Sequence, residues 1–424
     1  MPPELEPVPG TADICVPEVD DWVVLESAAR VVFARYGYGE IRTPVFERTD
    51  VFVRSIGDET EVVQKEMYTF EDRGGRSLTL RPEGTAGVMR AIANKGLGQG
   101  AERRVFYMGP MFRGERPAAG RRRQFHQIGV EAVGCCTPEV DVECIAMLLH
   151  YLREIGIADG RVLLNTRGVA ADHELVSAAL QAHFAPLKER LCNDCQRRLE
   201  TNVWRILDCK NEACREAVRA APRMPDLVGP ESREFFARVC SGLDALGLAY
   251  EVDPGLVRGL DYYEHTVFEV IHCVLRAETA VAGGGRYRIG LPGVKTAIEG
   301  VGFAVGMERL LLVRESLGYR AADETGPDVF VATPGVAAVI PGLVLAQDLR
   351  ARGLQVQVEL GARSMKAQMR TAGKAGAAFV LIQGDAELAE GSVTCKEMAS
   401  STQQNVPRAE VVEWICRRQG TESS

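Results

Sequence analysis

The stretch from Arg104 to Gly134 constrains the fold of this chain more than any other segment. Two runs rich in β-branched and aromatic residues, 104–113 and 125–133, flank a polar loop that contains glycine and proline. This pattern predicts an antiparallel hairpin with a long tip. Gln127 and Glu131 lie at even spacing on the returning strand, so we expect their side chains to point to the same face of the sheet.

Arginine side chains are concentrated at the predicted tip of this hairpin. The guanidinium group presents a fork of donors that matches two phosphate oxygens at once, which favours a polyphosphate ligand. A carboxylate and an amide beyond the arginines suit a small ligand that carries an amine. The charge run alone is equally compatible with a solvated basic loop. The arginines are Arg113, Arg116, Arg121, Arg122 and Arg123.

The order of residues in the hairpin resembles motif 2 of the class II aminoacyl-tRNA synthetases, in the form found in the histidyl-tRNA synthetase family. The matching residues are Phe-Arg-x-Glu-Arg-Pro, then Gly-Arg-x-Arg-Gln-Phe-His-Gln, then Glu. The resemblance implies that Arg113 acts in catalysis at the α-phosphate, and that Gln127 and Glu131 bind histidine. It further implies an ATP site formed by Arg113, Glu115, Arg121 and Phe125, together with Arg309 of a later motif.

A second segment, Leu-Arg-Pro-Glu-Gly-Thr at 80–85, is predicted to form a loop that leads into a helix from about Thr85. From the residues alone, Glu83 can be an acidic first-turn residue that the helix dipole favours. The resemblance implies instead that Glu83 and Thr85 hold the α-ammonium group of histidine.

The string Arg-Gly-Leu-Asp-Tyr-Tyr at 258–263 closely matches the histidine-binding signature of the same family. A tyrosine pair beside a strand more often packs in a core. The resemblance implies that Arg258 is a cation near the α-phosphate that also contacts histidine. It places Tyr263 at the imidazole ring, with Tyr262 beside it.

Two glycine-rich segments follow. AGGGRY at 282–287 predicts a close approach of backbone to a ligand or to other backbone. GVGFAVGMERLLL at 300–312 predicts a strand that feeds a helix, and it resembles motif 3, whose arginine is here Arg309. The chain departs from the family pattern at Arg288, where an acidic residue is usual, and at Pro9, where an arginine is usual.

The N-terminal region predicts a helix over 19–36, capped by Asp20 or Asp21 and ended by Gly37. A strand with Pro44 in its middle follows, which favours an edge or interface position. From the pattern alone the helix can simply pack on its own core. The resemblance to motif 1 implies a homodimer interface.

Residues 167–250 are predicted to form a charged helical insertion, which contains Cys192-x2-Cys195 and Cys209-x4-Cys214. These spacings are compatible with a tetrahedral zinc site. Four ordinary reduced thiols are the favoured explanation, since the second pair is loose and the family does not require a metal. We therefore assign no metal, and the choice between zinc and free thiols stays open.

Alternating strands and helices after Pro327 predict a small, mostly parallel sheet with right-handed crossovers. One predicted helix, 362–373, and the residue after it carry a row of basic residues that fits RNA phosphates or a solvated face equally well. The resemblance implies an anticodon-binding domain and tentative contacts with tRNA. The basic residues are Arg363, Lys366, Arg370 and Lys374.

Together with these features, the resemblance implies an α+β catalytic domain, an antiparallel sheet with flanking helices of the class II synthetase type. The rest of the chain is expected to form a helical insertion and a C-terminal α/β anticodon-binding domain. The expected domains are the catalytic domain in two parts, 1–166 and 251–322, the insertion, 167–250, and the anticodon-binding domain, 327–424.

The resemblance implies an AMP-forming ligase that attaches L-histidine to the 3′ end of histidine tRNA through histidyl-adenylate, using ATP with Mg²⁺. The alternatives are a catalytically silent regulatory subunit of ATP phosphoribosyltransferase and a nucleotide-binding RNA chaperone. The former typically lacks the C-terminal domain and the Arg-Gly-Leu-Asp-Tyr-Tyr string.

Composition bounds the partners and the compartment. The net charge of −8 argues against a protein that coats DNA by bulk electrostatics, but allows local basic patches. No apolar run approaches the roughly 20 residues that span a bilayer, and the N-terminus does not read as a signal peptide. Twelve scattered cysteines are typical of reduced thiols, so we expect a cytoplasmic protein with no membrane or DNA partner.

Overall fold

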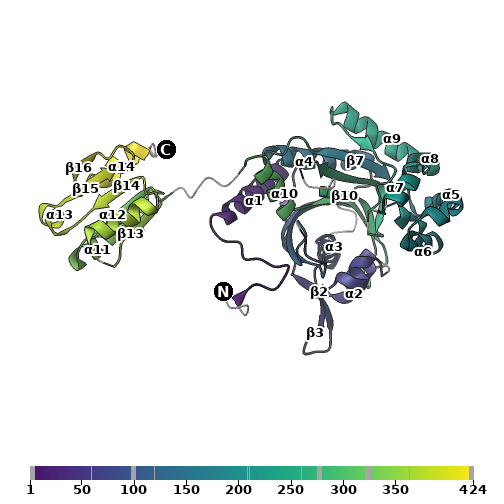
Figure 1. The fold of residues 1–424 in the computed structure, drawn as a ribbon, viewed down its shortest axis with the longest axis horizontal. Coiled ribbons are helices and arrows are strands. Elements are labelled where there is room, and N and C mark those ends of the chain that lie inside the picture. Colours follow the sequence, from purple (N-terminus) through teal and green to yellow (C-terminus); the bar gives the residue numbers. More distant parts are fainter. Residues whose placement is uncertain are drawn as a thin grey trace. The chain divides into compact units, whose positions relative to one another are not determined.

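The computed structural model describes residues 5–58, 60–96, 102–118, 120–207, 209, 211–258, 260–274, 279–319, 326–361 and 363–419. The chain divides into two compact units, Met1–Arg320 and Ala321–Ser424, and each is described by itself (Figure 1). Gly259, from the string at 258–263, and Ala362, the first residue of the helix predicted at 362–373, lie outside the described residues.

The first unit is built around an eight-stranded sheet in the order β1-β5-β6-β11-β10-β9-β7-β8. The pairings from β5 to β7 are antiparallel, and the short edge strands β1 and β8 pair in parallel. This arrangement confirms the predicted antiparallel sheet and the hairpin. The strands are β1 (Gly39–Glu40), β5 (Arg103–Phe112), β6 (Gln124–Val133), β7 (Arg161–Thr166), β8 (Glu251–Val252), β9 (Tyr263–His272), β10 (Thr279–Ile289) and β11 (Ile298–Gly306).

Helices cover one face of this sheet and form the main core with it. Strand β6 shows how alternation separates the faces: Ile128, Val130 and Ala132 enter this core, whereas Gln127 and Glu131 point to the opposite face. The covering helices are α1 (Glu18–Arg35), α4 (Pro138–Glu154), α9 (Pro230–Ala245) and α10 (Met307–Ser316).

Helix α1 has the predicted buried stripe, but it begins earlier than expected. Pro17 occupies the N-cap, so the predicted cap at Asp20 or Asp21 is wrong. Both aspartates lie in the first turn, where the positive end of the helix dipole favours them without a capping hydrogen bond. Gly37, with φ of +80°, follows the helix end as predicted.

The opposite face of the sheet carries the second core cluster and a smaller sheet. The strand predicted around Pro44 is interrupted there, because proline has no N–H for the ladder. Its second half, β2 (Phe46–Arg48), joins β4 (Ser77–Leu80) and β3 (Thr69–Glu71) in the order β2-β4-β3. The helical elements on this side are α2 (Thr49–Ile56), the π-helical turn Val62–Glu66 and α3 (Thr85–Asn94).

The insertion is helical, as expected, and encloses a core cluster of its own. Its elements are the 3₁₀ turns η3 (Ala170–Asp172), η4 (Ala185–Arg190) and η5 (Val203–Ile206), and the helices α5 (His173–Phe184), α6 (Asn193–Thr201), α7 (Glu212–Arg219) and α8 (Met224–Leu227).

The second unit holds a five-stranded sheet in the order β13-β12-β14-β15-β16. The prediction of a mostly parallel sheet is wrong, because β14-β15 and β15-β16 are antiparallel. Only the short helix α13 separates β14 from β15, and a parallel crossover needs about a dozen residues or more. The elements are β12 (Val329–Ala332), α11 (Val336–Arg350), β13 (Val356–Val358), α12 (Met365–Lys374), β14 (Phe379–Ile382), α13 (Asp385–Glu390), β15 (Ser392–Glu397), β16 (Gln403–Pro407) and α14 (Val411–Gln419).

Among the described ranges, no helix is at once long enough and apolar enough to cross a bilayer.

Candidate functional site

An inner cavity lies on the face of the large sheet that points away from the main core. The structure brings together here residues that are distant in the sequence, from the loop before α3 and from strands β6 and β9. Eight residues singled out from the sequence line it: Glu83, Thr85, Arg113, Gln127, Glu131, Arg258, Tyr262 and Tyr263.

The carboxyl group of Glu131 is the most unusual polar group in this cavity. It is 1% exposed, and its Oε2 atom has no hydrogen-bond partner among the described residues. The amide oxygen of Gln127 is likewise buried without such a partner. Burial raises the pKa of Glu131 to about 8. Buried polar atoms are normally satisfied, so these two indicate a ligand that brings the missing hydrogen bonds.

Glu83 is engaged in a helix cap and still lines the cavity. Its two carboxylate oxygens accept the backbone N–H groups of Thr85 (2.6 Å) and Ala86 (2.7 Å) at the start of α3. Glu83 therefore lies at the N-terminus of α3, where the helix dipole favours a negative charge, which is one of the two roles considered from the sequence. A carboxylate oxygen has two acceptor sites, so each keeps capacity for one further donor.

Tyrosines form the wall of the inner cavity. The rings of Tyr262 and Tyr263 lie 4.7 Å apart, and the ring of Tyr287 lies 5.9 Å from that of Tyr262. Sequence reasoning missed Tyr287 and Tyr107 as lining residues. The structure explains the place of Tyr107: it pairs across the hairpin with Gly129, where an added Cβ would lie 2.3 Å from its ring.

Arg258 stands at the boundary between the inner cavity and a larger outer one. Its guanidinium group forms an ion pair with Glu269 of β9 and lies 5.8 Å from the ring centre of Tyr263. It also explains a glycine of the AGGGRY cluster: a Cβ at Gly283 would lie 2.4 Å from its Nη1 atom. Sequence reasoning missed Glu269, although a lone acidic residue inside the apolar run TVFEVI was a signal.

The outer cavity contains the residues expected at ATP. Arg113 borders both cavities; its Nε donates to the carbonyl of Pro82 (2.9 Å), and its guanidinium lies 5.4 Å from the ring centre of Phe125. At the far side, Arg309 donates to the carbonyls of Gly120 (3.3 Å) and Ala280 (2.7 Å). All five expected ATP residues line this cavity: Arg113, Glu115, Arg121, Phe125 and Arg309.

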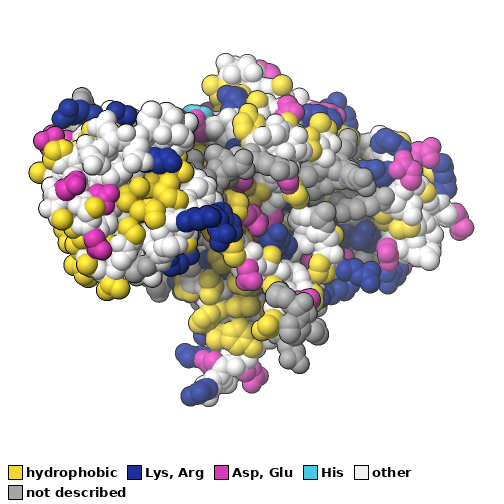
Figure 2. All heavy atoms as spheres, turned by 60° about the vertical axis from the view of Figure 1, so that its left-hand side comes forward, with side chains coloured by type: hydrophobic (Ala, Val, Ile, Leu, Met, Phe, Trp, Pro, Cys, Tyr) yellow, Lys and Arg dark blue, Asp and Glu magenta, His cyan; other side chains and the backbone are white. Residues whose placement is uncertain are grey.

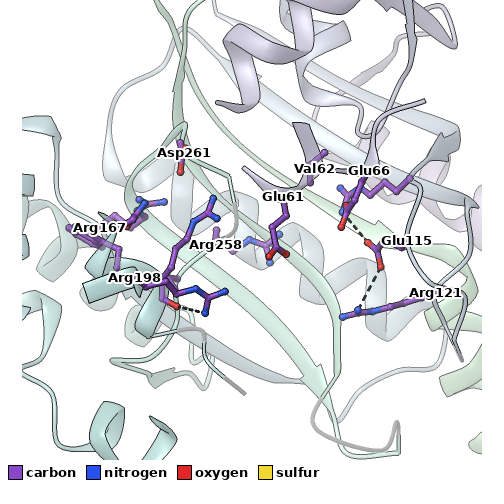
Figure 3. A pocket seen from close by; sticks show the side chains of 14 residues that line it. Glu61, Val62, Glu66, Glu115, Arg121, Arg167, Arg198, Arg258 and Asp261 are labelled. Carbon is purple, nitrogen blue, oxygen red and sulfur yellow. Dashed lines mark hydrogen bonds and ion pairs between the residues drawn. The ribbon is translucent and has the colours of Figure 1, made fainter. Parts of the chain in front are cut away.

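A third cavity connects this region to the helical insertion. It is lined on the side of the other two cavities by Arg113, Glu115, Arg121 and Arg258. Figure 3 shows Arg167 and Arg198 on one side of this cavity, and Glu61, Val62 and Glu66 on the other. The carboxylate of Glu115 lies 3.6 Å from the guanidinium of Arg121 (Figure 3). Three cavities therefore share the side chains of Arg113 and Arg258.

The two departures from the family pattern lie away from the inner cavity. Arg288 is half-exposed and forms a cross-strand ion pair with Glu299 of β11 at 3.6 Å, since the two residues face each other in the ladder. Pro9 lies against the hairpin tip, where its carbonyl accepts from the guanidinium of Arg123 at 3.2 Å.

In the second unit, the row of basic residues is only partly helical. Helix α12 begins at Met365, so Arg363 precedes it instead of lying inside it as expected, and it forms an ion pair with Glu359. Lys366, Arg370 and Lys374 are exposed on the helix. The exposed basic face therefore consists of these three residues.

Comparison with known proteins agrees with this geometry. The family model described as histidyl-tRNA synthetase matches residues 10–310, and the model described as anticodon binding domain matches residues 328–418. A histidine–tRNA ligase of Solidesulfovibrio magneticus is 46% identical over 95% of this chain and 95% of its own. A histidine–tRNA ligase of Halothermothrix orenii is 45% identical over 95% of this chain and 97% of its own.

Solved structures give the same answer for the fold. The apo histidyl-tRNA synthetase of S. aureus has a TM-score of 0.80 and 36% identity, and the match covers 97% of this chain and 99% of that one. A Bacillus halodurans protein described as an ATP phosphoribosyltransferase regulatory subunit/histidyl-tRNA synthetase shares the fold at 20% identity, with a TM-score of 0.62 over 91% of this chain and 98% of its own. Cavity, motifs and full-length similarity together show that the chain belongs to the histidyl-tRNA synthetase family.

Proposed function

We propose that this protein activates L-histidine with ATP and transfers it to the 3′ end of histidine tRNA. The observation that carries the proposal is the sharing of Arg113 and Arg258 by the inner and outer cavities. A small amino acid in the first and a nucleotide in the second would meet between two fixed guanidinium groups. Charging of histidine tRNA with labelled histidine tests the whole reaction.

The chemical problem at that meeting point is charge. The histidine carboxylate attacks the α-phosphate of ATP in line, so an anion approaches an anion, and pyrophosphate leaves. Fixed positive charge at the point where negative charge develops lowers the barrier. We assign this role to Arg113, held by the carbonyl of Pro82, and to Arg258, held by Glu269.

Histidine recognition is assigned to the inner cavity. Glu83, Thr85 and Gln127 would bind the amino-acid backbone, with the free acceptor capacity of Glu83 and Gln127 directed at the α-ammonium group. Glu131 and Tyr263 would each read one imidazole nitrogen, with Tyr262 beside them. A buried site that hydrogen-bonds a substrate group rejects analogues that lack the group, because its own polar atoms are then left unpaired.

ATP is assigned to the outer cavity. Arg309 would stack on adenine and reach the γ-phosphate, Phe125 would form the other wall, and Arg121 and Glu115 would lie along the phosphates. Mg²⁺ usually keeps water and phosphate ligands and needs only one or two carboxylates. Glu115 and Glu269 line this cavity and fit that modest requirement. When bound with ATP, the ion neutralises part of the phosphate charge.

Contact with tRNA is assigned to the exposed basic face of α12. The double charge reversal Lys366→Glu and Arg370→Glu is expected to raise the Michaelis constant for tRNA by about tenfold or more, because phosphate contacts become repulsive. Amino-acid activation should be unchanged, since the site of adenylate formation lies in the other unit. Steady-state charging and ATP–pyrophosphate exchange measure the two effects.

Arg417→Glu is the matched control for this pair. Arg417 is an exposed arginine on α14, which packs in the core cluster on one face of the sheet, whereas α12 packs in the cluster on the other. Its reversal changes the net charge of the unit without touching α12. Equal loss of charging and activation in the double variant refutes the assignment.

We further propose a cytoplasmic homodimer. Figure 2 shows hydrophobic side chains gathered over the small sheet that projects at the bottom of the view. Val45, Phe46, Tyr68 and Phe70 are 37–47% exposed there. Exposed apolar patches of this kind are typical of interaction sites. Light scattering of the purified chain is expected to give twice its 46.2 kDa mass, and a monomer mass at micromolar concentration contradicts the dimer.

A further inference from the structure

The four cysteines of the insertion converge on one point. Cys192 immediately precedes α6 and Cys195 lies in its first turn, while Cys209 follows η5 and Cys214 lies in α7. Their four Sγ atoms all lie within 4.8 Å of one another, and those of Cys192 and Cys209 are 3.8 Å apart. In the part of the chain that the structure describes, no other group of three or more histidine, cysteine or carboxylate ligands is gathered this way.

These distances match a tetrahedral thiolate site. Zinc–sulfur bonds are about 2.3 Å long, so the sulfurs of a tetrahedron around zinc are separated by about 3.8 Å. A disulfide needs a sulfur–sulfur distance of about 2.05 Å, and none of the four is in one. Only small movements would bring all four sulfurs to a common centre.

The surroundings also favour a metal over four idle thiols. The backbone N–H of Cys192 donates to Sγ of Cys214 at 3.2 Å, a contact that stabilises negative charge on sulfur. Cys195 and Cys214 are buried, whereas Cys192 and Cys209 are partly exposed, which leaves an entry path for an ion. An all-sulfur tetrahedral set selects zinc or iron, and zinc is the usual ion for closed structural sites with two to four residues between paired cysteines.

The two cysteine pairs bracket a segment that reaches the third cavity. Arg198, Asn202, Trp204 and Arg205 lie between Cys195 and Cys209 in the chain and line the cavity that also contains Arg113 and Arg258. Figure 3 shows Arg198 and Arg258 on the same side of it. Trp204 is fixed by a hydrogen bond from its Nε1 to Ser177 (2.8 Å) and lies 5.4 Å below the guanidinium of Arg167.

We propose that Cys192, Cys195, Cys209 and Cys214 bind one Zn²⁺, which clips α6 to α7 and thereby holds the intervening segment against the wall of the third cavity. The insertion has only a small core of its own, in which Cys195 and Cys214 are members, so a metal crosslink there adds stability that burial alone supplies poorly. The inference does not depend on the proposed activity.

Metal analysis of the full-length protein, purified with a phosphine reductant and without chelator or affinity-column metal, is the test. We expect about one zinc per chain. Less than about half an equivalent, or iron in place of zinc, overturns the proposal. The variant Cys192→Ser/Cys209→Ser, chosen because both side chains are partly exposed, should lose the metal. The control Cys15→Ser/Cys273→Ser changes two exposed cysteines elsewhere and should keep it.

A titration of the wild-type protein keeps the test decisive if the double variant does not fold. Mercurial modification of thiols, followed with a colorimetric zinc indicator, should release zinc in step with four cysteines. Cobalt substitution should give the ultraviolet sulfur-to-metal charge-transfer band of a tetrahedral thiolate site. Zinc that survives modification of these thiols belongs to another site and contradicts the assignment.

Hydrogen exchange tests the clip itself. Removing zinc should speed amide exchange in residues 196–206, while the hairpin strands β5 and β6 stay protected. Unchanged exchange in 196–206 after complete zinc removal would show that the metal does not hold the segment, and would overturn that part of the proposal.

Discussion

Replacing Arg258 with alanine is expected to slow formation of histidyl-adenylate by about 10²- to 10³-fold, the usual effect of removing one donor that stabilises transition-state charge. Histidine affinity should change far less, because the guanidinium acts chiefly on charge that develops during attack on the α-phosphate. Single-turnover pyrophosphate release measures the rate, and equilibrium dialysis with histidine measures the affinity. A variant with near-normal activation contradicts the role.

Two controls separate this role from a structural one. Glu269→Gln keeps the guanidinium and removes its ion-pair partner, so it should cost much less than Arg258→Ala. If both variants lose activation equally, the loss cannot be assigned to the charge of Arg258 alone. Arg288→Ala, on the neighbouring strand and paired with Glu299, removes one arginine outside the cavities and should leave activation unchanged.

Replacing Glu131 with alanine is expected to raise the dissociation constant for histidine by about 10- to 10²-fold, since an imidazole nitrogen left unpaired in a buried site costs about 1–3 kcal/mol. The loss should appear in binding more than in the rate at saturating histidine. Isothermal titration calorimetry measures it. Unchanged affinity would remove Glu131 from the imidazole site, whatever its burial.

The pH dependence follows from the same residue. Burial raises the pKa of Glu131 to about 8 in the free protein, and the pKa of the unperturbed imidazole is about 6.5. Between these values a protonated carboxyl meets a neutral imidazole, so the pair already holds the one proton that its hydrogen bond needs. Above about pH 8 binding must take up a proton, and below about 6.5 it must release one, each costing about tenfold in affinity per pH unit.

We therefore expect the affinity for histidine to be greatest between about pH 6.5 and 8. The variant Glu131→Gln should lose the part of the alkaline decline that arises from the carboxyl, because an amide donates without titrating. The α-ammonium group of histidine titrates equally in both proteins, so it cancels in the comparison. Identical alkaline limbs in the two proteins would contradict the assignment of the raised pKa to the imidazole contact.

Periodicity was sufficient to predict much of the catalytic fold. The alternation in the hairpin placed Gln127 and Glu131 on one face, because side chains of a strand alternate whatever its partners are. The buried apolar face of α1 is confirmed, and so is the strand β11 that leads into α10 just before Arg309. Both could be predicted because they follow from the local pattern of residues. These features depend on local spacing, which a single sequence displays.

Features that depend on tertiary contacts could not be predicted in this way. The spacing of Arg258 and Glu269 in the sequence does not predict their ion pair, which depends on how β9 packs beside β10. The antiparallel pairing of β14 with β15 is a different case, because the connection between them is visibly too short for a parallel crossover; the prediction overlooked this local feature and did not recognise α13 within it. The convergence of the four cysteines required the packing of α6, η5 and α7 into one core cluster, since the spacing of the cysteines allowed either outcome.

ATP–pyrophosphate exchange with each of the twenty amino acids measures the proposed activation step without the need for tRNA. We expect exchange with histidine alone, because the two proposed sites meet at Arg113 and Arg258, and because Glu131 and Tyr263 would be left with unpaired polar atoms by any side chain other than imidazole. Folded protein that supports no exchange with any amino acid would contradict the proposed activity, and would favour a regulatory relative that binds without reacting.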